Sequence, residues 1–345
     1  MEPRQSRKTT VQTVSQPVVA PASRPTRQPF TRTPQFRNFA ARVFRMCQKF
    51  GVSVTPRHFY WPIPDLNALT RKDWTACALS EGVNLQVERQ LQLLQADLLA
   101  FQAECNFSEK PAELEHQFHF NNGFFERVDA EIAYSMVRHF QPSRIVEIGS
   151  GNSTRLLAAA LARNREQGAP GDLIAIEPHP DAVLMRGFPG FTELIPRQVQ
   201  QVPMDIFTSL GPGDILFIDS SHVVAIESDV IHEYLRILPS LKPGVVIHIH
   251  DIFMPADYPE KFVMTNLCFW GEQYLLEAFL SYNRAFEVLW SSSAMQFFHR
   301  EALEQYFPAW VGSFERMPAG MRAFTPTLDG KNVWPCSFWI QKTSA

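Results

Sequence analysis

The stretch Arg144-Ile-Val-Glu-Ile-Gly-Ser-Gly-Asn-Ser-Thr154 decides the fold class of this 345-residue chain. Its first half is apolar and β-branched, which is typical of a strand buried on both faces of a parallel sheet. Gly149 and Gly151 then permit a tight turn and let a ligand approach the backbone closely. The polar residues that end the stretch can cap a helix starting near Leu156. The pattern therefore predicts a strand, a ligand-binding turn and a helix, as at the ligand sites of open α/β sheets.

The turn lacks the features of a phosphate-binding loop. A dinucleotide-binding loop has a third glycine where this chain has Thr154, which argues against a nicotinamide dehydrogenase. A P-loop needs a lysine that the turn does not contain. Glu147 would repel a phosphate and attract a cation, so a positively charged cofactor is expected. The residues predicted to bind it are Glu147, Gly149, Ser150, Gly151, Asn152 and Ser153.

Three further apolar runs end in an acidic residue in the same way. They are residues 172–177, 214–219 and 245–251, which end in Glu177, Asp219 and Asp251. Because the carboxyl ends of parallel strands meet at one edge of a sheet, these acids are expected close to Glu147.

The second of these strand ends is predicted to bind a ribose. Glu177 lies 28 residues after Gly149 and can accept hydrogen bonds from both ribose hydroxyls. Pro178, Asp219 and Ser220 are expected to contact the same cofactor. Asp205 precedes a short helical segment, and two interpretations of it stay open: a contact to an adenine amino group, or an ordinary helix cap.

These motifs are similar to those of a known enzyme superfamily. The E-x-G-x-G turn, the lead-in at 121–131, F-I-D-S-S-H at 217–222 and H-I-H-D-I-F at 248–253 carry the likeness. Over 121–340 the chain resembles class I S-adenosylmethionine-dependent methyltransferases, in particular the group called methyltransferase type 24. The resemblance implies S-adenosylmethionine as cofactor and an α/β, Rossmann-like fold. Its seven-stranded sheet is mostly parallel, with the last strand antiparallel.

Histidines and acids at the last two parallel strand ends are the candidates for catalysis. If the acceptor is an alcohol, a base must remove its proton, and His222, His250 and Asp251 are the predicted catalytic residues. His248 shares the strand face of His250 but is expected to be a satisfied core histidine. Asp219, His222, His250 and Asp251 form an alternative metal site for Mg²⁺ or iron. Some similar sugar and macrolide O-methyltransferases bind a vicinal diol through such a metal, although they use mostly carboxylates.

An aromatic and polar segment follows the last of these strand ends. Tyr258, Trp270, Glu272 and Tyr274 are predicted to contact the acceptor, because aromatic faces stack on sugar-like rings and carboxylates accept hydrogen bonds from hydroxyls. Packing of the loop against the core explains each of them equally well.

The function favoured by these motifs is O-methylation of a hydroxyl on a small molecule or glycan. One alternative is an iron-dependent hydroxylase-like enzyme on the same fold. Another is a non-catalytic methyltransferase-like scaffold, although a scaffold would not need to keep both Glu147 and Glu177.

Composition limits the partners and the location of the protein. The 32 basic and 35 acidic residues nearly cancel, so no overall field attracts nucleic acid. The five widely spaced cysteines fit free thiols in the cytoplasm. No apolar run approaches the roughly 18 residues that span a bilayer, and the start does not resemble a signal peptide.

The region ahead of residue 121 divides into two parts. Residues 1–37, with seven Lys/Arg and one acid, are predicted to be a disordered, proline-rich tail that is either inert or binds an anionic partner. Residues 38–120 are predicted to be a helical accessory region, with helices over 38–50 and 87–105 and an aromatic loop at 58–65. In similar enzymes such helices cap the cofactor cleft or make dimer contacts, so a homo-oligomer is possible. The methyltransferase domain is expected to span 121–345.

Overall fold

A computed structural model describes residues 34–55 and 60–343 of the chain, in two compact units, Met1–Ile63 and Pro64–Ala345. The first unit contains one helix, α1 (Pro34–Gln48), among its described residues. It includes the last four residues of the predicted tail, because proline is well suited to the first turn of a helix. The rest of the predicted tail, and His58 and Phe59 of the predicted aromatic loop, lie outside the described residues.

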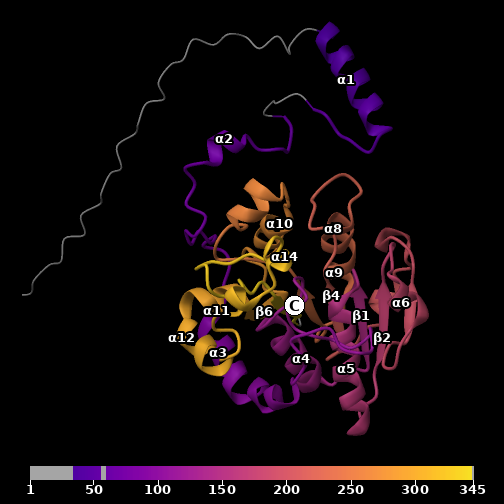
Figure 1. The fold of residues 1–345 in the computed structure, drawn as a ribbon. Coiled ribbons are helices and arrows are strands. Elements are labelled where there is room, and N and C mark those ends of the chain that lie inside the picture. The colour runs from indigo at the N-terminus through magenta and orange to yellow at the C-terminus, as the bar shows by residue number, and fades with distance from the viewer. Residues whose placement is uncertain (1–33, 56–59, 344–345) are drawn as a thin grey trace, which may run out of the picture. The chain divides into compact units, whose positions relative to one another are not determined.

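A seven-stranded sheet forms the centre of the second unit (Figure 1). The strand order is β3-β2-β1-β4-β5-β7-β6, with five parallel strands and with β7 antiparallel to both β5 and β6. The predicted Rossmann-like sheet is therefore confirmed, including the antiparallel last strand. The strands are β1 (Arg144–Ile148), β2 (Asp172–Ile176), β3 (Glu193–Ile195), β4 (Ile215–Ile218), β5 (Val246–Ile249), β6 (Phe286–Ser291) and β7 (Phe338–Lys342).

Helices cover both faces of this sheet, as the strand sequences require. Ile145 of β1 packs in one apolar cluster with α4 (Asp129–Phe140) and α5 (Asn152–Glu166). Val146 and Ile148 pack in a second cluster on the opposite face, which includes residues of α10 (Glu272–Leu280). Alternate residues of one strand thus point to two cores, which is why the parallel strands are mostly apolar.

The remaining elements are shorter. The helices are α2 (Leu66–Leu69), α3 (Val87–Ala96), α6 (Ala182–Arg186), α7 (Asp205–Thr208), α8 (Asp229–His232), α9 (Leu238–Ser240), α11 (Ser292–Phe298), α12 (Arg300–Tyr306), α13 (Ser313–Arg316) and α14 (Ala319–Arg322). The described residues also contain the 3-10 segments η2 (Leu98–Glu104) and η3 (Val199–Gln201) and the π-helical segments η4 (Glu233–Ile237) and η5 (Lys261–Thr265).

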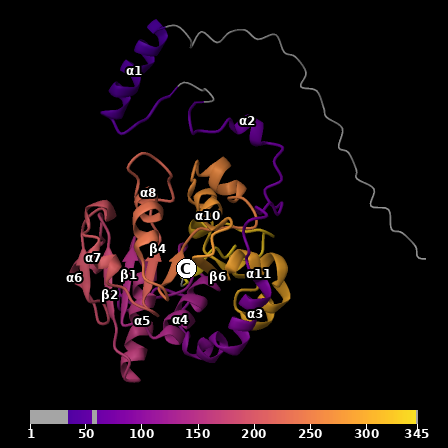
Figure 2. The same ribbon diagram turned by 180° about the vertical axis from the view of Figure 1, so that it is seen from behind.

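Helix α3 of the accessory region lies beside one edge of the sheet. Figure 2 shows α3 and α11 close to β6, and α3 contacts both of them. The single helix predicted over 87–105 is divided, because Asp97 leaves helical geometry with φ −121° and the chain continues as the 3-10 segment η2. The boundary predicted at residue 120 stays a prediction. Among the described residues, no helix has both the length and the apolar character needed to cross a membrane.

Candidate functional site

The strand order places a ligand-binding crevice at the carboxyl ends of β1 and β4. From β1 the chain continues to β2 on one side, whereas β4 and β5 lie on the other, and ligands of open α/β sheets bind at this switch point. Gly149 has φ +77°, and a Cβ there would lie 1.9 Å from the carbonyl oxygen of Asp219. Only glycine therefore allows the loops after β1 and β4 to touch. Gly151 has no atom within 4 Å of its Cβ position, so the turn is open to a ligand.

Glu147, the acid that ends the first motif, is completely buried. Ser153 Oγ donates a 2.7 Å hydrogen bond to its Oε1, while Oε2 has no partner among the described residues. Burial raises the pKa of this carboxyl to about 8, although the hydrogen bonds from Ser153 and Thr154 lower it. A buried carboxyl oxygen without a partner, beside an open turn, fits the cationic cofactor predicted from the sequence, because a bound cation would favour the charged carboxylate.

Glu177 lies at the end of β2 and faces the first loop. Its Oε2 accepts the Ser150 backbone N–H at 3.1 Å, and its Oε1 accepts the His179 N–H at 2.7 Å. Each carboxylate oxygen keeps a further lone pair. The predicted ribose acid is therefore fixed in orientation and still able to accept two ligand hydroxyls.

A cavity of about 590 Å³ lies over these strand ends, a size typical of a small-molecule site. The predicted residues that line it are Gly149, Glu177, Pro178, Asp219 and Ser220. Gln198 and Gln200, in and beside η3, also line it and were not predicted. Asp205 does not line it: the residue begins α7 with an exposed side chain, so the structure gives no support for the adenine contact.

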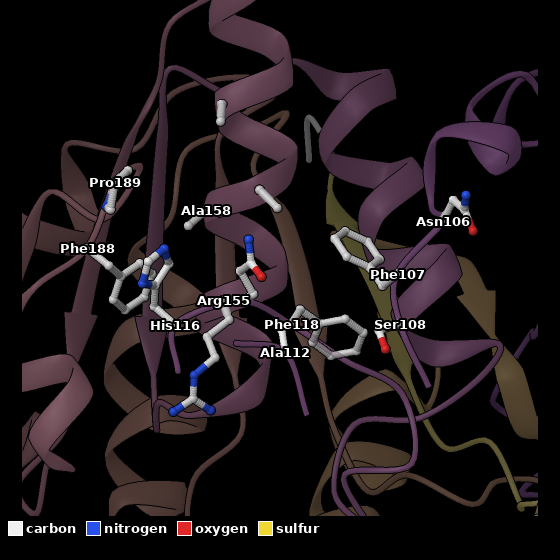
Figure 3. A pocket seen from close by; sticks show the side chains of 13 residues that line it. Asn106, Phe107, Ser108, Ala112, His116, Phe118, Arg155, Ala158, Phe188 and Pro189 are labelled. Atoms are coloured by element: carbon white, nitrogen blue, oxygen red, sulfur yellow. The ribbon is translucent and has the colours of Figure 1, made fainter. Parts of the chain in front are cut away.

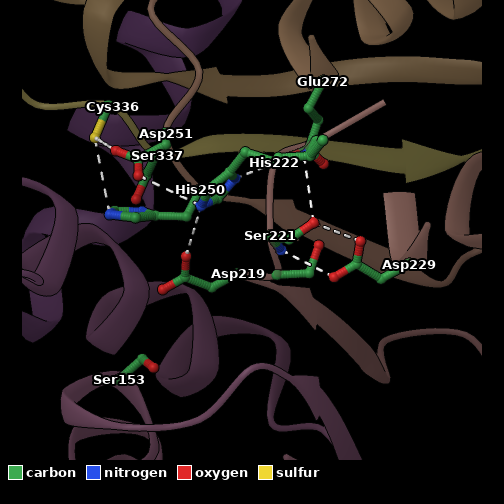
Figure 4. Close-up of polar contacts among 12 residues, drawn as sticks. Ser153, Asp219, Ser221, His222, Asp229, His250, Asp251, Glu272, Cys336 and Ser337 are labelled. Carbon is green, nitrogen blue, oxygen red and sulfur yellow. Dashed lines mark hydrogen bonds and ion pairs between the residues drawn. The ribbon is translucent and has the colours of Figure 1, made fainter. Parts of the chain in front are cut away.

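Asp219, His222 and Asp251 form a polar cluster at the ends of β4 and β5 (Figure 4). His222 Nε2 lies 3.5 Å from Asp219 Oδ1 and 3.5 Å from Asp251 Oδ2. His222 has φ +60° and Asp251 has φ +55°, left-handed values that are uncommon outside glycine. Such strain persists only where the surroundings enforce it and is frequent at functional sites.

Glu272 orients the histidine of this cluster. Its Oε2 lies 2.8 Å from His222 Nδ1, and the His222 carbonyl accepts the N–H groups of Gly271 and Glu272 at the start of α10. Glu272 was predicted to contact the acceptor. It is fully buried behind His222 instead, where an acceptor does not reach it. Its bond to Nδ1 leaves Nε2 facing the two aspartates.

The other predicted acceptor residues differ in their exposure. Trp270 is half-buried with its ring centroid 4.6 Å from that of His222, which places it at the cluster. Tyr258 is 2% exposed, and its hydroxyl accepts the Gln273 N–H, so it packs inside the loop. Tyr274 is 50% exposed, and its hydroxyl donates to Asp257.

The charges in the cluster favour a cation. Burial lowers the pKa of His222, but Glu272, Asp251 and Asp219 outweigh it and raise the pKa to about 10. The histidine is therefore protonated at neutral pH. Three carboxylates surround this single positive charge, and the ligand atoms of Asp219, His222 and Asp251 lie within 4.8 Å of one another. Two carboxylates and an imidazole are a suitable donor set for Mg²⁺, Mn²⁺ or Fe²⁺, with Glu272 as the partner of the ligating histidine.

His250 belongs to a different cluster from the one predicted. Its Nε2 lies 3.8 Å from the Cys336 sulfur, and its Nδ1 has no partner among the described residues. Asp129, which accepts the Cys336 and Ser337 N–H groups, completes this buried set. Burial lowers the pKa of His250, but the negative charges of Asp219, Asp251 and Asp129 outweigh this effect. The pKa is therefore raised above its ordinary value. His248 packs in the core as predicted, with Nε2 3.0 Å from Ser337 Oγ. Its Nδ1 has no partner among the described residues, so the histidine is not fully satisfied.

Cys336 connects the two clusters. Its thiol donates to Asp251 Oδ1 at 3.3 Å, so it supports the aspartate that faces His222. Neither Asp129 nor Cys336 was predicted as a site residue. They lie 207 positions apart in the chain and meet only because the segment before β7 returns to α4.

A second cavity, of about 380 Å³, lies against α5 away from these clusters (Figure 3). Ala158 and Arg155 line it together with Phe107, Phe118 and Phe188. No residue predicted for the cofactor, acceptor or metal lines this cavity. It is therefore separate from the candidate site.

Comparison with known proteins identifies the region that holds the site. A family model described as "Methyltransferase domain" matches residues 146–252, from β1 to the loop after β5. A relative from Archaeoglobus fulgidus, named only as an uncharacterized protein, is 30% identical over 170 residues. The match covers 47% of this chain and 76% of that protein.

Two solved structures align with most of the chain. An O-methyltransferase from Bacillus cereus in complex with S-adenosylhomocysteine is 11% identical, with a TM-score of 0.35 over 80% of this chain and 94% of that one. The MycE methyltransferase of the mycinamycin pathway, in complex with magnesium, S-adenosylhomocysteine and mycinamycin VI, is 13% identical. Its TM-score is 0.30 over 72% of this chain and 53% of that one. At these scores the likeness is partial, and the fold assignment rests on the strand order.

Proposed function

We propose that this chain, whose residues 146–252 match a methyltransferase domain, is a class I S-adenosylmethionine-dependent methyltransferase of the type 24 group, and that it methylates a hydroxyl oxygen of a small-molecule or glycan acceptor. The observation that carries this proposal is the Asp219–His222–Asp251 cluster, which adjoins the cofactor cavity through Asp219. A nucleophile that is more acidic than an alcohol, or that has no proton to lose, would have less need of such a group of acids and imidazole at the reacting centre.

The reaction needs alignment and one proton acceptor. The acceptor oxygen bonds to the methyl carbon while the carbon–sulfur bond breaks and S-adenosylhomocysteine leaves. The hydroxyl proton must pass to a base during or before this step. We assign that base to Asp251, since His222 is already protonated and its neighbour Asp251 is accessible, with 18% of its side chain exposed. The protonated His222 then donates a hydrogen bond from Nδ1 to Glu272 and keeps its Nε2 directed at Asp219 and Asp251.

The same three side chains would hold a divalent cation. When bound, such an ion lowers the pKa of a coordinated hydroxyl and so assists its deprotonation. Glu272 would keep the Nδ1 side of His222 occupied and leave Nε2 for the ion. Because the ion and the His222 proton compete for Nε2, ion binding is expected to strengthen as the pH rises.

The surroundings of the cluster fit an acceptor with neighbouring hydroxyls on a ring. Asp219 and Asp251 offer carboxylate oxygens on two sides of His222. Trp270 presents a half-buried aromatic face next to them, suited to stacking on a sugar-like ring. This arrangement supports a diol-bearing glycan or natural product as the acceptor class.

Calorimetric titration with S-adenosylmethionine and S-adenosylhomocysteine tests the first part of this proposal. We expect micromolar binding of both. Labelled methyl transfer to a panel of diol-bearing glycans, each paired with its singly blocked analogue, then tests the acceptor class. A folded protein that binds neither cofactor would instead be the scaffold. Tightly bound iron with oxidant-dependent product formation would identify the hydroxylase-like alternative.

Glu177→Ala is expected to weaken S-adenosylmethionine binding at least tenfold, because both the ligand's ribose hydroxyls and two backbone N–H groups lose their acceptor. Calorimetry measures the change. Glu193→Ala, which removes an exposed acid from neighbouring β3, is the matched control and should bind normally. Equal affinity of the Glu177 variant and the wild type would remove this residue from the cofactor site.

Chelation is expected to abolish most turnover, and Mg²⁺ to restore it, if Asp219, His222 and Asp251 hold a cation during catalysis. The measurement is methyl transfer after EDTA treatment, followed by titration with Mg²⁺, Mn²⁺ and Fe²⁺. S-adenosylhomocysteine affinity serves as the control and should change little. Undiminished turnover after exhaustive chelation would leave Asp251 as an unassisted base and end the metal proposal.

A further inference from the structure

Charge is divided unequally between the two units of the chain. Residues 1–63 hold eleven of the 32 basic residues and only one of the 35 acidic residues. The second unit therefore has 21 basic and 34 acidic residues. The small net charge of the whole protein is the sum of a positively charged first unit and a negatively charged second unit. Such asymmetry at a unit boundary indicates that the basic unit has an anionic partner.

Helix α1 gives this basic unit an apolar face. Residues Phe39, Val43, Met46 and Cys47 recur at helical spacing. Arg42 lies at the edge of this face, next to Phe39 and Met46, and Arg45 lies on the opposite side. The helix contains no acidic residue. Phe39 is 63% exposed and Met46 is 57% exposed, so the unit does not bury these apolar side chains within itself.

We propose that α1 is an interfacial helix that binds the surface of an anionic lipid membrane. A 15-residue helix is marginally stable in water without a surface to cover its apolar face. Phenylalanine and methionine on one face, with arginine at its edge and on the opposite side, match the pattern of helices that lie in the headgroup region. The eleven cations of residues 1–63 supply long-range attraction to acidic headgroups.

The apolar face separates this partner from nucleic acid. Nucleic acid phosphates attract the arginines equally well, and a base can stack on Phe39, but nucleic acid offers no apolar layer to cover the methionine, valine and cysteine beside it. A membrane surface satisfies both faces of α1. The helix is also too short to span the bilayer, so the interaction is peripheral.

The test uses the full chain and two kinds of vesicle, one of phosphatidylcholine alone and one that also contains phosphatidylglycerol. We expect the protein to cosediment with the anionic vesicles only. It should dissociate at about 1 M salt, where the Debye length is roughly 3 Å and the attraction between charges is screened. Circular dichroism should show a gain of helix on binding.

Paired variants separate the two faces. Phe39→Ser with Met46→Ser is expected to weaken vesicle binding at least tenfold. Phe324→Ser with Met185→Ser is the matched control, since these residues are 61% and 63% exposed in the second unit, and it should bind normally. Arg42→Gln with Arg45→Gln should weaken binding about tenfold and reduce its salt dependence.

Three results would overturn the proposal. If the wild-type protein does not bind anionic vesicles at low salt, the basic unit is not a membrane-binding element. Equal binding to both vesicles would remove the electrostatic component. If the apolar variant binds like wild type while the arginine variant does not, and anisotropy shows tight binding of a labelled oligonucleotide, the partner is nucleic acid.

Discussion

We expect Asp251→Asn to lower kcat by about 10²–10⁴-fold, the usual contribution of a positioned general base. The substitution removes the charge but keeps the shape of the side chain. Asparagine also tolerates the left-handed backbone of this position, φ +55°, as readily as aspartate does. The effect should therefore appear in turnover, with S-adenosylmethionine affinity within about threefold of wild type. Steady-state kinetics and calorimetry on the same preparation measure the two quantities.

Asp172→Asn is the matched control for this variant. Asp172 begins β2, at the opposite end of the sheet strands from the cluster, and its side chain is exposed. It should retain full turnover. If Asp251→Asn also retains full turnover, Asp251 is not the base, and the acceptor proton leaves by another route.

The strands could be predicted from the sequence because burial on both faces leaves a local signature. The run predicted at 172–177 forms β2 over Asp172–Ile176, and the run predicted at 214–219 forms β4 over Ile215–Ile218. Each is apolar enough to be recognised without knowledge of its neighbours. The helix break at Asp97 was missed because leucines continue at helical spacing through the 3-10 segment.

The candidate site was predictable only where it follows strand ends. Asp219, His222 and Asp251 meet because parallel strands deliver their carboxyl ends to one edge. The contact of Glu272 with His222 depends on how α10 packs against that edge. No sequence motif predicts this contact. The position of His250 likewise depends on the return of Cys336 towards α4.

Glu147 combines stability and ligand binding in one side chain. With a pKa of about 8 instead of the ordinary 4.5, it keeps its proton in the folded, ligand-free protein at neutral pH. Losing that proton leaves a buried negative charge with no partner on Oε2 among the described residues. A cationic cofactor would favour the charged form. The site is therefore least stable when it is empty and the pH is high.

Glu147→Gln is accordingly expected to stabilise the ligand-free protein at high pH and to weaken cofactor binding. The pKa of Glu147 is higher in the folded protein than in the unfolded one. The protonated side chain therefore contributes fully to the free energy of unfolding of the wild type below pH 4.5, and this contribution is lost as the pH rises to about 8. Each pKa unit corresponds to about 1.4 kcal/mol, so the loss is on the order of several kcal/mol. Glutamine does not titrate, so the variant's advantage in unfolding free energy should grow across this window and be near zero at pH 4.5.

Urea unfolding of wild type and variant from pH 4.5 to 9 measures that difference, in which the titration of all other groups cancels. Glu301→Gln, an exposed change on α12, is the control and should show no pH-dependent difference. Calorimetry in buffers of different ionisation enthalpy supplies a second measurement. Wild type should release close to one proton on binding S-adenosylmethionine at pH 7, and Glu147→Gln should release none from this site. Parallel stability profiles for the two proteins would mean that Glu147 is charged in the empty site, and that some group other than the cofactor already compensates it.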